Sequence, residues 1–413
     1  MPAGAALDGD EERTGPVRAD RDDPGVGGDR AGAGENRSLG EEIVSCIARQ
    51  HIAQDRYRLP GLRRAVDPSA NSTHSPFYLI DLVKCRALPA PPDKHPIMPS
   101  TPCETELSDL LLKVNKTLRY HARRAMTAAR GAWWDLSRRP LEKPIFVVGC
   151  SRAGTTLVYK TLSESGELGS LQRETHDFWI GLHPLAKKGW RSHALDASDA
   201  SPRDRDVVSR YFFSQTGRLR IVDKNNQNGL CVAYLHALFP DAHFVYIKRS
   251  PGDNIHSLIE GWGRAEEFAT WSEDLPVEVR VDGGRYRRWC FFLFDGWQRY
   301  VNSPIEEVCA AQYAAMNRAI IDSSKAVPRA QWTEIQYEDL VRDPVDGFRG
   351  AFESCGLEFT PDLRRHCEGV LSTPYNAFSE IRLDKWRDQG NRERIERVLP
   401  EVADVVADMG YPR

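Results

Sequence analysis

The residues with the clearest chemical potential in this chain form a short loop, GCSRAGTT, at residues 149–156. Gly149 and Gly154 permit a close approach of the backbone, and Thr155 and Thr156 add hydroxyl donors. Successive N–H groups of such a loop can face one concavity at a helix N-terminus, where the macrodipole favours a phosphate. The loop therefore predicts a phosphate-binding site.

The position of the cation narrows the chemistry of this loop. In nucleoside triphosphatases the same G-x-x-x-x-G spacing is followed by a lysine that reaches the β and γ phosphates. Here Thr155 follows Gly154, and the cation, Arg152, lies inside the loop. The site keeps an anion clamp but lacks the lysine that serves γ-phosphoryl transfer. A plain turn between a strand and a helix, with an arginine present by chance, is the structural alternative.

A second pair of polar residues follows the apolar run 244–247. Arg249 comes directly after this run, and Ser257 lies eight residues later in a predicted helix. An arginine at a strand end and a hydroxyl two turns into the next helix can converge on one terminal phosphate. An arginine paired with surface carboxylates is the alternative.

These motifs resemble those of a known family. SRAGTT after a buried strand resembles the 5′-phosphosulfate loop of sulfotransferases that use 3′-phosphoadenosine-5′-phosphosulfate (PAPS), and R-x-P with the later serine resembles their 3′-phosphate motif. The arginine within the loop is typical of the bacterial and tyrosylprotein branches. YEDLVRDP at 337–344 and DKWR at 384–387 resemble further stretches of the bacterial branch, so the resemblance extends over about residues 143–413.

The resemblance implies PAPS as co-substrate, no metal, and transfer of a sulfuryl group to a hydroxyl or amine of a small-molecule, glycan or lipid acceptor. Lys385 and Arg387 stand in for part of an adenosine motif, R-K-G-x-x-G-D-W, that this chain lacks. The residues assigned to PAPS are Ser151, Arg152, Ala153, Gly154, Thr155, Thr156, Arg249, Ser257, Lys385 and Arg387.

The resemblance also implies catalytic roles. Arg152 and Lys224 are expected to stabilise charge that develops during transfer. The cytosolic branch has a catalytic histidine after its second strand, but Asn226 occupies that position here. Glu174, in RETHDFW, is therefore our candidate base, and His176 is the second choice. A P-loop kinase and a non-catalytic nucleotide-binding module stay open as alternative functions.

The elements that must position these residues can be predicted from apolar runs. Strand, helix, strand and helix in succession indicate βαβ units, hence an α/β fold of the P-loop type with a parallel sheet flanked by helices. Ligands of such sheets bind beyond the carboxyl ends of the strands, where Arg152, Lys224 and Arg249 fall. We expect strands at 145–148, 221–222, 244–247 and 333–336.

The chain divides into three predicted parts. Residues 1–38 contain almost no large apolar side chains and are expected to be disordered. Residues 39–142 are expected to form a helical segment packed on the core, and residues 143–413 the sulfotransferase-like domain. The helical segment has apolar residues at helical intervals (Leu107, Leu110, Leu111, Val114 and Leu118) and basic residues that predict a solvated face rather than an anionic entrance (Arg119, Arg123, Arg124 and Arg130).

The composition of the chain limits its possible functions and its possible location. The net charge of −3 argues against a general nucleic-acid binder. Nine scattered cysteines without a C-x-x-C pair favour a reducing cytoplasm, and no apolar run is long enough to span a membrane.

The aromatic block at 289–297 predicts a buried helix or a lid over the acceptor pocket. The tryptophans that fit either an acceptor pocket or a plain core are Trp262, Trp271, Trp289 and Trp297. Homo-oligomerisation stays open.

Overall fold

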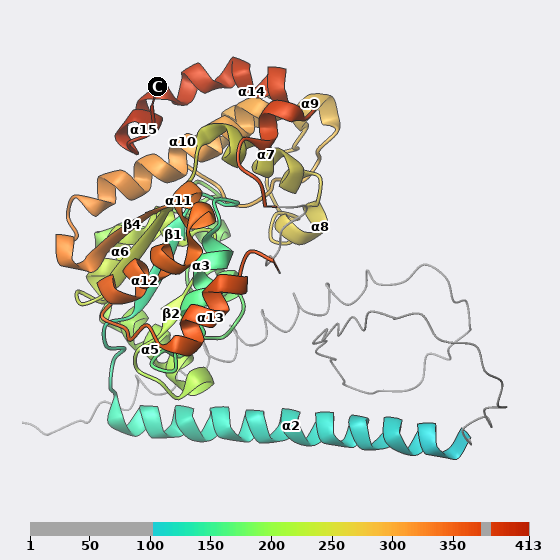
Figure 1. Ribbon diagram of the computed structural model, residues 1–413, viewed down its shortest axis with the longest axis vertical. Coiled ribbons are helices and arrows are strands. Elements are labelled where there is room, and N and C mark those ends of the chain that lie inside the picture. Colours follow the sequence, from blue (N-terminus) through green and yellow to red (C-terminus); the bar gives the residue numbers. More distant parts are fainter. Residues whose placement is uncertain (1–101, 373–380, 413) are drawn as a thin grey trace, which may run out of the picture. The chain divides into compact units, whose positions relative to one another are not determined.

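The computed structural model describes residues 102–372 and 381–412 (Figure 1). The predictions for 1–38, and for the part of the helical segment before residue 102, lie outside the described residues.

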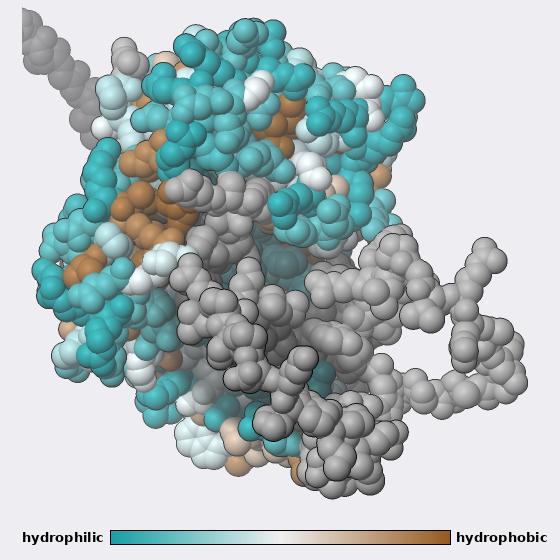
Figure 2. Space-filling model, turned by 45° about the vertical axis from the view of Figure 1, so that its right-hand side comes forward, coloured by the Kyte–Doolittle hydropathy of each residue, from teal (hydrophilic) through white to brown (hydrophobic). Residues whose placement is uncertain are grey.

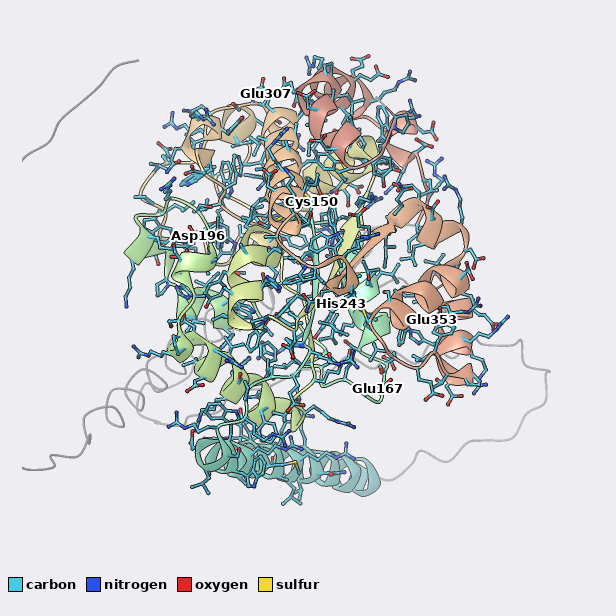
Figure 3. All side chains as sticks on the ribbon, turned by 90° about the vertical axis from the view of Figure 1, so that its left-hand side faces the viewer. Cys150, Glu167, Asp196, His243, Glu307 and Glu353 are labelled. Atoms are coloured by element: carbon cyan, nitrogen blue, oxygen red, sulfur yellow. The ribbon has the colours of Figure 1, made fainter. Side chains whose placement is uncertain are left out.

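A four-stranded parallel sheet stands at the centre of the fold. Its spatial order is β2-β1-β3-β4, so the chain crosses over between strands. Figure 3 labels Cys150, which follows β1, and His243, which begins β3, at opposite ends of the sheet. This arrangement confirms the prediction of an α/β fold with a parallel sheet. The strands are β1 (Ile145–Gly149), β2 (Val222–Asp223), β3 (His243–Lys248) and β4 (Trp332–Gln336).

Helices account for most of the remaining structure. The α-helices are α2 (Pro102–Ser137), α3 (Thr155–Leu162), α4 (His176–Leu182), α5 (Pro202–Thr216), α6 (Val232–Leu238), α7 (Pro251–Trp262), α8 (Ala265–Phe268), α9 (Val281–Gly284), α10 (Ile305–Ser324), α11 (Tyr337–Arg342), α12 (Pro344–Ser354), α13 (Pro361–Gly369), α14 (Arg392–Val398) and α15 (Ala403–Asp408). The 3₁₀ helices are η1 (Leu185–Lys188), η2 (Ala197–Asp199), η3 (Asn228–Cys231), η4 (Trp297–Tyr300), η5 (Arg329–Gln331), η6 (Lys385–Asp388) and η7 (Leu399–Val402).

Helices cover both faces of the sheet. Phe146 and Val148 belong to a hydrophobic cluster with residues of α6, α7 and α10. Ile145 and Val147 point the other way, into a cluster with α3, α12 and α13. Because both faces are covered, every residue of β1 is buried and the strand is a continuous apolar run.

The aromatic block at 289–297 is buried but irregular, so the prediction of a helix there is wrong. Trp289 and Phe292 are fully buried in the core. Helical bonding is replaced by local and long-range bonds: the Trp289 Nε1–H donates to the Phe292 carbonyl at 2.8 Å, and the Phe291 N–H to the Phe268 carbonyl at 2.9 Å. Trp262, Trp289 and Trp297 are core residues, and Trp271 is partly buried against the same hydrophobic cluster.

Candidate active site

The loop between β1 and α3 has a tightly constrained backbone. Gly154, the residue before α3, has φ 100°, and Arg152 has φ 68°, an uncommon value for a residue with a side chain. A Cβ on Gly154 would lie 2.4 Å from the Tyr337 ring, and one on Gly149 would lie 2.8 Å from the Ile247 carbonyl oxygen. The neighbouring β3 and α11 therefore leave room for glycine only.

The two predicted halves of the phosphate site are joined directly. Arg249, just after β3, donates from Nη1 to the carbonyl oxygen of Arg152 at 2.7 Å. The Arg152 Nε lies 3.4 Å from the Ser257 Oγ on α7, and the Arg249 guanidinium lies 4.5 Å from the centre of the Tyr337 ring. The carboxyl ends of β1 and β3 thus bring both arginines and Ser257 to one place.

Lys224 adds a third strand end to the site. Its Nζ donates to the Glu174 Oε1 at 2.6 Å and to the Thr156 Oγ1 at 3.2 Å. The Lys224 side chain is 6% exposed, whereas that of Glu174, in the loop before α4, is 30% exposed. Glu174 is therefore the more accessible member of the pair.

Most of the predicted site residues line one cavity. Its lining includes Ser151, Arg152, Gly154, Thr155, Thr156, Glu174, Lys224, Arg249, Ser257 and Lys385.

Three predicted residues do not line this cavity. Ala153 is buried in the loop, where its N–H donates to the Cys150 carbonyl. The His176 Nε2 lies 3.0 Å from an Asp177 carboxylate oxygen. Arg387 is more than half exposed and pairs with Asp384 at 3.2 Å.

The cavity also contains residues that the sequence interpretation had not assigned to the site. Asp253, His256 and Glu260 lie on the same face of α7 as Ser257, and their spacing along the helix could have identified them. Tyr337 begins the YEDLVRDP motif. Asn226, at the position where the cytosolic branch has its histidine, also lines the cavity. No sequence signal marked the remaining five, which are Leu157, Phe268, Phe291, Ile381 and Arg382.

The electrostatics of the lining favour an anion. Five cationic side chains and three carboxylates line the cavity. Burial, together with the nearby Arg249, lowers the pKa of Arg152 to about 10, so Arg152 remains protonated at neutral pH. Because two guanidinium groups repel each other in a buried site, an anion bound beside both of them would be stabilised.

Several buried polar atoms around the cavity have no hydrogen-bond partner within the described residues. These include the Ser151 Oγ, the Arg249 Nε and the Asp253 Oδ1. Buried polar atoms in folded proteins are nearly always paired. A polar ligand in the cavity would supply the missing partners.

The pKa values of Glu174 and His176 are shifted in opposite directions. Burial raises the pKa of Glu174, but the Lys224 ammonium group, together with His176 and Arg152, outweighs burial and holds the pKa below its ordinary value. Burial lowers the pKa of His176, but the carboxylates of Asp177 and Glu174 together outweigh burial, and the pKa is raised. At neutral pH Glu174 is therefore an ionised carboxylate that can accept a proton.

Within residues 102–372 and 381–412, no cluster of three or more His, Cys, Asp or Glu side chains could hold a metal ion. In the same part of the chain, no helix combines the length and apolar character needed to cross a membrane.

In a comparison with protein families, the model of the sulfotransferase family matches residues 144–361. This range contains all the strands of the sheet and every lining residue of the cavity except the three at 381–385.

Curated relatives are distant. An uncharacterized protein of Aquifex aeolicus is 21% identical over 65% of this chain and 33% of its own length. The omega-hydroxy-beta-dihydromenaquinone-9 sulfotransferase Stf3 of Mycobacterium bovis is 20% identical over 51% of each chain. The nodulation protein NoeE of Sinorhizobium fredii is 22% identical over 66% of this chain and 67% of its own. The chain spans about half or less of the length of the first two relatives.

Among solved structures, a sulfotransferase from Alicyclobacillus acidocaldarius is 19% identical, with a TM-score of 0.39 over 67% of this chain and 97% of its own. Sulfotransferase STF9 from Mycobacterium avium is 15% identical, with a TM-score of 0.39 over 68% of this chain and 81% of its own.

Proposed function

The chain belongs to the sulfotransferase family, and from this premise we propose that it transfers the sulfuryl group of PAPS to a hydroxyl or amine of an acceptor. The observation that carries the proposal is the bond from the Arg249 Nη1 to the Arg152 carbonyl, 2.7 Å long. It holds two cations, from the ends of β1 and β3, at one cavity. Two separate anionic groups on one ligand, as PAPS has, match two such cations.

The cavity fits PAPS in its polar groups. The loop residues Ser151 to Thr156 would hold the 5′-phosphosulfate, and Arg249 with Ser257 the 3′-phosphate. The unpaired Ser151 Oγ and Arg249 Nε lie in these two groups and support the assignment. Lys385, on η6, lines the same cavity, and we propose that it adds a further cation toward the nucleotide. Arg387 and Ala153 lie outside the lining, so their contributions would be indirect.

The chemistry divides between the co-substrate and the chain. PAPS supplies a sulfuryl group, which forms a bond to the acceptor oxygen or nitrogen as its S–O bond to the 5′-phosphate breaks, leaving 3′,5′-adenosine bisphosphate. Arg152, Lys224 and Thr156 would donate hydrogen bonds to oxygens that gain charge during this in-line exchange. No metal ion takes part in the proposed reaction.

Glu174 is the proposed base for the acceptor proton. Its carboxylate lies in the cavity lining, and it is more exposed than Lys224. In the structure Lys224 neutralises Glu174 at 2.6 Å. A movement of the Lys224 ammonium group toward the reacting oxygens would therefore both stabilise their charge and make Glu174 more basic.

The acceptor class is proposed as a small molecule, glycan or lipid that bears a hydroxyl or amine. Phe268, Phe291 and Ile381 line the cavity, which supports an acceptor with an apolar part. The relative Stf3, named as an omega-hydroxy-beta-dihydromenaquinone-9 sulfotransferase, supports a hydroxyl as the accepting group.

We propose that residues 143–413 form the catalytic domain and that it works in a reducing compartment such as the cytoplasm. In support of the domain, β1 begins two residues after this boundary, at Ile145. In support of the compartment, Cys150, Cys231, Cys290, Cys309, Cys355 and Cys367 are all free and buried.

The test is transfer of radiolabelled sulfur from PAPS to a panel of hydroxyl and amine acceptors by the full chain. We expect labelled product and an equal amount of 3′,5′-adenosine bisphosphate with at least one acceptor, without added metal. The matched control is Glu174→Gln, which should lose the transfer. Labelled product that is equally abundant with the Glu174→Gln chain would contradict the assigned base, and label on no acceptor would contradict the activity.

A further inference from the structure

The most prominent feature outside the cavity is an exposed apolar face on α2. We define the apolar face of α2 by its large exposed residues. They are Val114, Leu118, Met126, Trp133 and Leu136, with exposed fractions of 47%, 64%, 53%, 50% and 87%. At about 100° per residue, these side chains fall within about 120° of the helix circumference. Ala122, Ala125 and Ala129 lie within the same sector.

The core contact of α2 uses a different side of the helix. Trp134 is 1% exposed, and Asp135 forms a salt bridge of 2.7 Å with Arg210 on α5. Gly131, one turn earlier, faces the Arg210 guanidinium. Only the edge of the apolar face approaches α5, where the Trp133 ring stacks on Phe213 at 5.5 Å. Figure 2 shows pale and brown residues beside teal ones at the lower edge of the molecule.

The charge of this helix is opposite in sign to that of the chain. Residues 114–134 contain five lysines and arginines and no aspartate or glutamate, although the whole chain has a net charge of −3. The cations are Lys116, Arg119, Arg123, Arg124 and Arg130.

This charge bears on which partner could cover the apolar face. A second copy of α2 paired through this face would bring further cations, Arg119 and Arg123 among them, close to those of the first copy, which disfavours pairing. An apolar helix face bordered by cations is the pattern that lies in the interface of a membrane with anionic lipids. Charge complementarity therefore favours an anionic lipid surface over a second copy of the chain.

We propose that α2 lies on the surface of a membrane that contains anionic lipids. Val114, Leu118, Met126 and Leu136 enter the boundary between headgroups and acyl chains, and Trp133 sits at headgroup level. The long side chains of Arg119 and Arg123, which border the apolar face, reach the lipid phosphates while their stems lie along the apolar region. This binding is independent of the cavity, and no helix in the described residues crosses the membrane.

Co-sedimentation of the full chain with vesicles tests the proposal. The vesicles are phosphatidylcholine alone, and phosphatidylcholine mixed with phosphatidylglycerol. We expect binding to the mixed vesicles at least about tenfold stronger than to phosphatidylcholine alone, and weakened at high salt because screening shortens the reach of the charges.

Variants separate the apolar and charged contributions. Leu118→Gln with Met126→Gln, which leaves the net charge unchanged, should weaken binding to the mixed vesicles about tenfold or more. Arg119→Gln with Arg123→Gln should remove most of the preference for anionic lipid. The matched control is Val277→Gln, since Val277 is an exposed apolar residue outside α2 (38% exposed), and it should bind like the wild type. Circular dichroism checks that each variant is folded.

Three results would overturn the proposal. They are no binding of the wild type to the mixed vesicles, equal binding by the Leu118→Gln, Met126→Gln chain, and a dimer in light scattering that this double change dissolves while vesicle binding is absent. The last result would assign the apolar face of α2 to a second copy of the chain instead.

Discussion

At the scale of single residues, the proposed mechanism depends on which side chain takes up the proton released by the acceptor's hydroxyl or amine. Glu174 lines the cavity and is ionised at neutral pH, whereas His176 lies outside the lining and pairs with Asp177. Replacing Glu174 with Gln should lower kcat by about 100- to 10,000-fold, the range for loss of a general base. His176→Ala should change kcat little. Steady-state kinetics of the two variants decide between them, and the reverse ranking would make His176 the base.

The ion pair of Lys224 and Glu174 predicts a shift in pH dependence. A base must be unprotonated, so kcat/KM falls as the pH drops through the pKa of Glu174. Burial raises that pKa, whereas Lys224 and, to a smaller extent, His176 and Arg152 lower it, with a net lowering. Lys224→Met removes the largest of the lowering causes and leaves burial in place, so the acid limb of the pH profile of the residual activity should move to higher pH.

The control for this shift is Lys325→Met, which removes a surface pair with Asp322 and should leave the acid limb in place. An acid limb in Lys224→Met that is unmoved, or displaced to lower pH, would show that Glu174 is not the group that sets it.

Residue types and spacing in the sequence predicted half of the cavity lining. The loop at 149–156 and the pair of Arg249 and Ser257 could be predicted because each follows a recognisable strand. Phe268, Phe291 and Ile381 could not be predicted as lining residues. In a sequence, an apolar side chain that lines a pocket has the same pattern as one that belongs to the core. His176 does not line the cavity although Glu174 does, because a separation of two residues does not fix the direction of a side chain.

At the scale of elements, the loop before α3 is the part least tolerant of change. Gly154→Ala would place a Cβ 2.4 Å from the Tyr337 ring at φ 100°. The left-handed backbone alone costs about 1 to 2 kcal/mol for a residue with a side chain, and the clash adds to it. We expect a lower midpoint of thermal unfolding and loss of nucleotide binding.

The matched control is Gly350→Ala in α12, where a new Cβ meets nothing within 4 Å. Alanine should stabilise this helix by up to about 1 kcal/mol and leave nucleotide binding unchanged. Thermal unfolding followed by circular dichroism compares the two variants. Equal stability of Gly154→Ala and the wild type would show that the loop is less constrained than described.

The strands could be predicted from the sequence, but the structure of the aromatic block at 289–297 could not. The strands were recognisable because helices cover both faces of the sheet and leave runs such as Ile145 to Val148 wholly apolar. The aromatic block at 289–297 was expected to be a helix or a lid, yet it is irregular and buried. Its backbone is satisfied by partners distant in sequence, including the Gln312 amide, which donates to the Cys290 carbonyl at 2.9 Å. Such partners cannot be deduced from local periodicity.

At the scale of the whole molecule, charge is unevenly distributed. The chain carries a net charge of −3, yet cations gather at two places, the cavity and α2. The basic residues of α2 were expected to form a solvated face, and they are exposed apart from the partly buried Arg130. Their alignment beside an exposed apolar face emerges only once the core contact of α2 is known, because an apolar stripe in a sequence usually faces the core.

The central claim is that Arg152 and Arg249 together form the binding site of PAPS. Calorimetric titration of 3′,5′-adenosine bisphosphate without magnesium tests it most directly, with the wild type, Arg249→Ala, and Arg349→Ala as the control. Arg349 pairs with Asp346 on α12, away from the cavity lining.

We expect binding by the wild type and by Arg349→Ala. Loss of the charged hydrogen bonds should weaken Arg249→Ala by about 10- to 100-fold. Wild-type protein that binds ATP but not 3′,5′-adenosine bisphosphate, or an Arg249→Ala variant that binds as tightly as the wild type, would contradict the account.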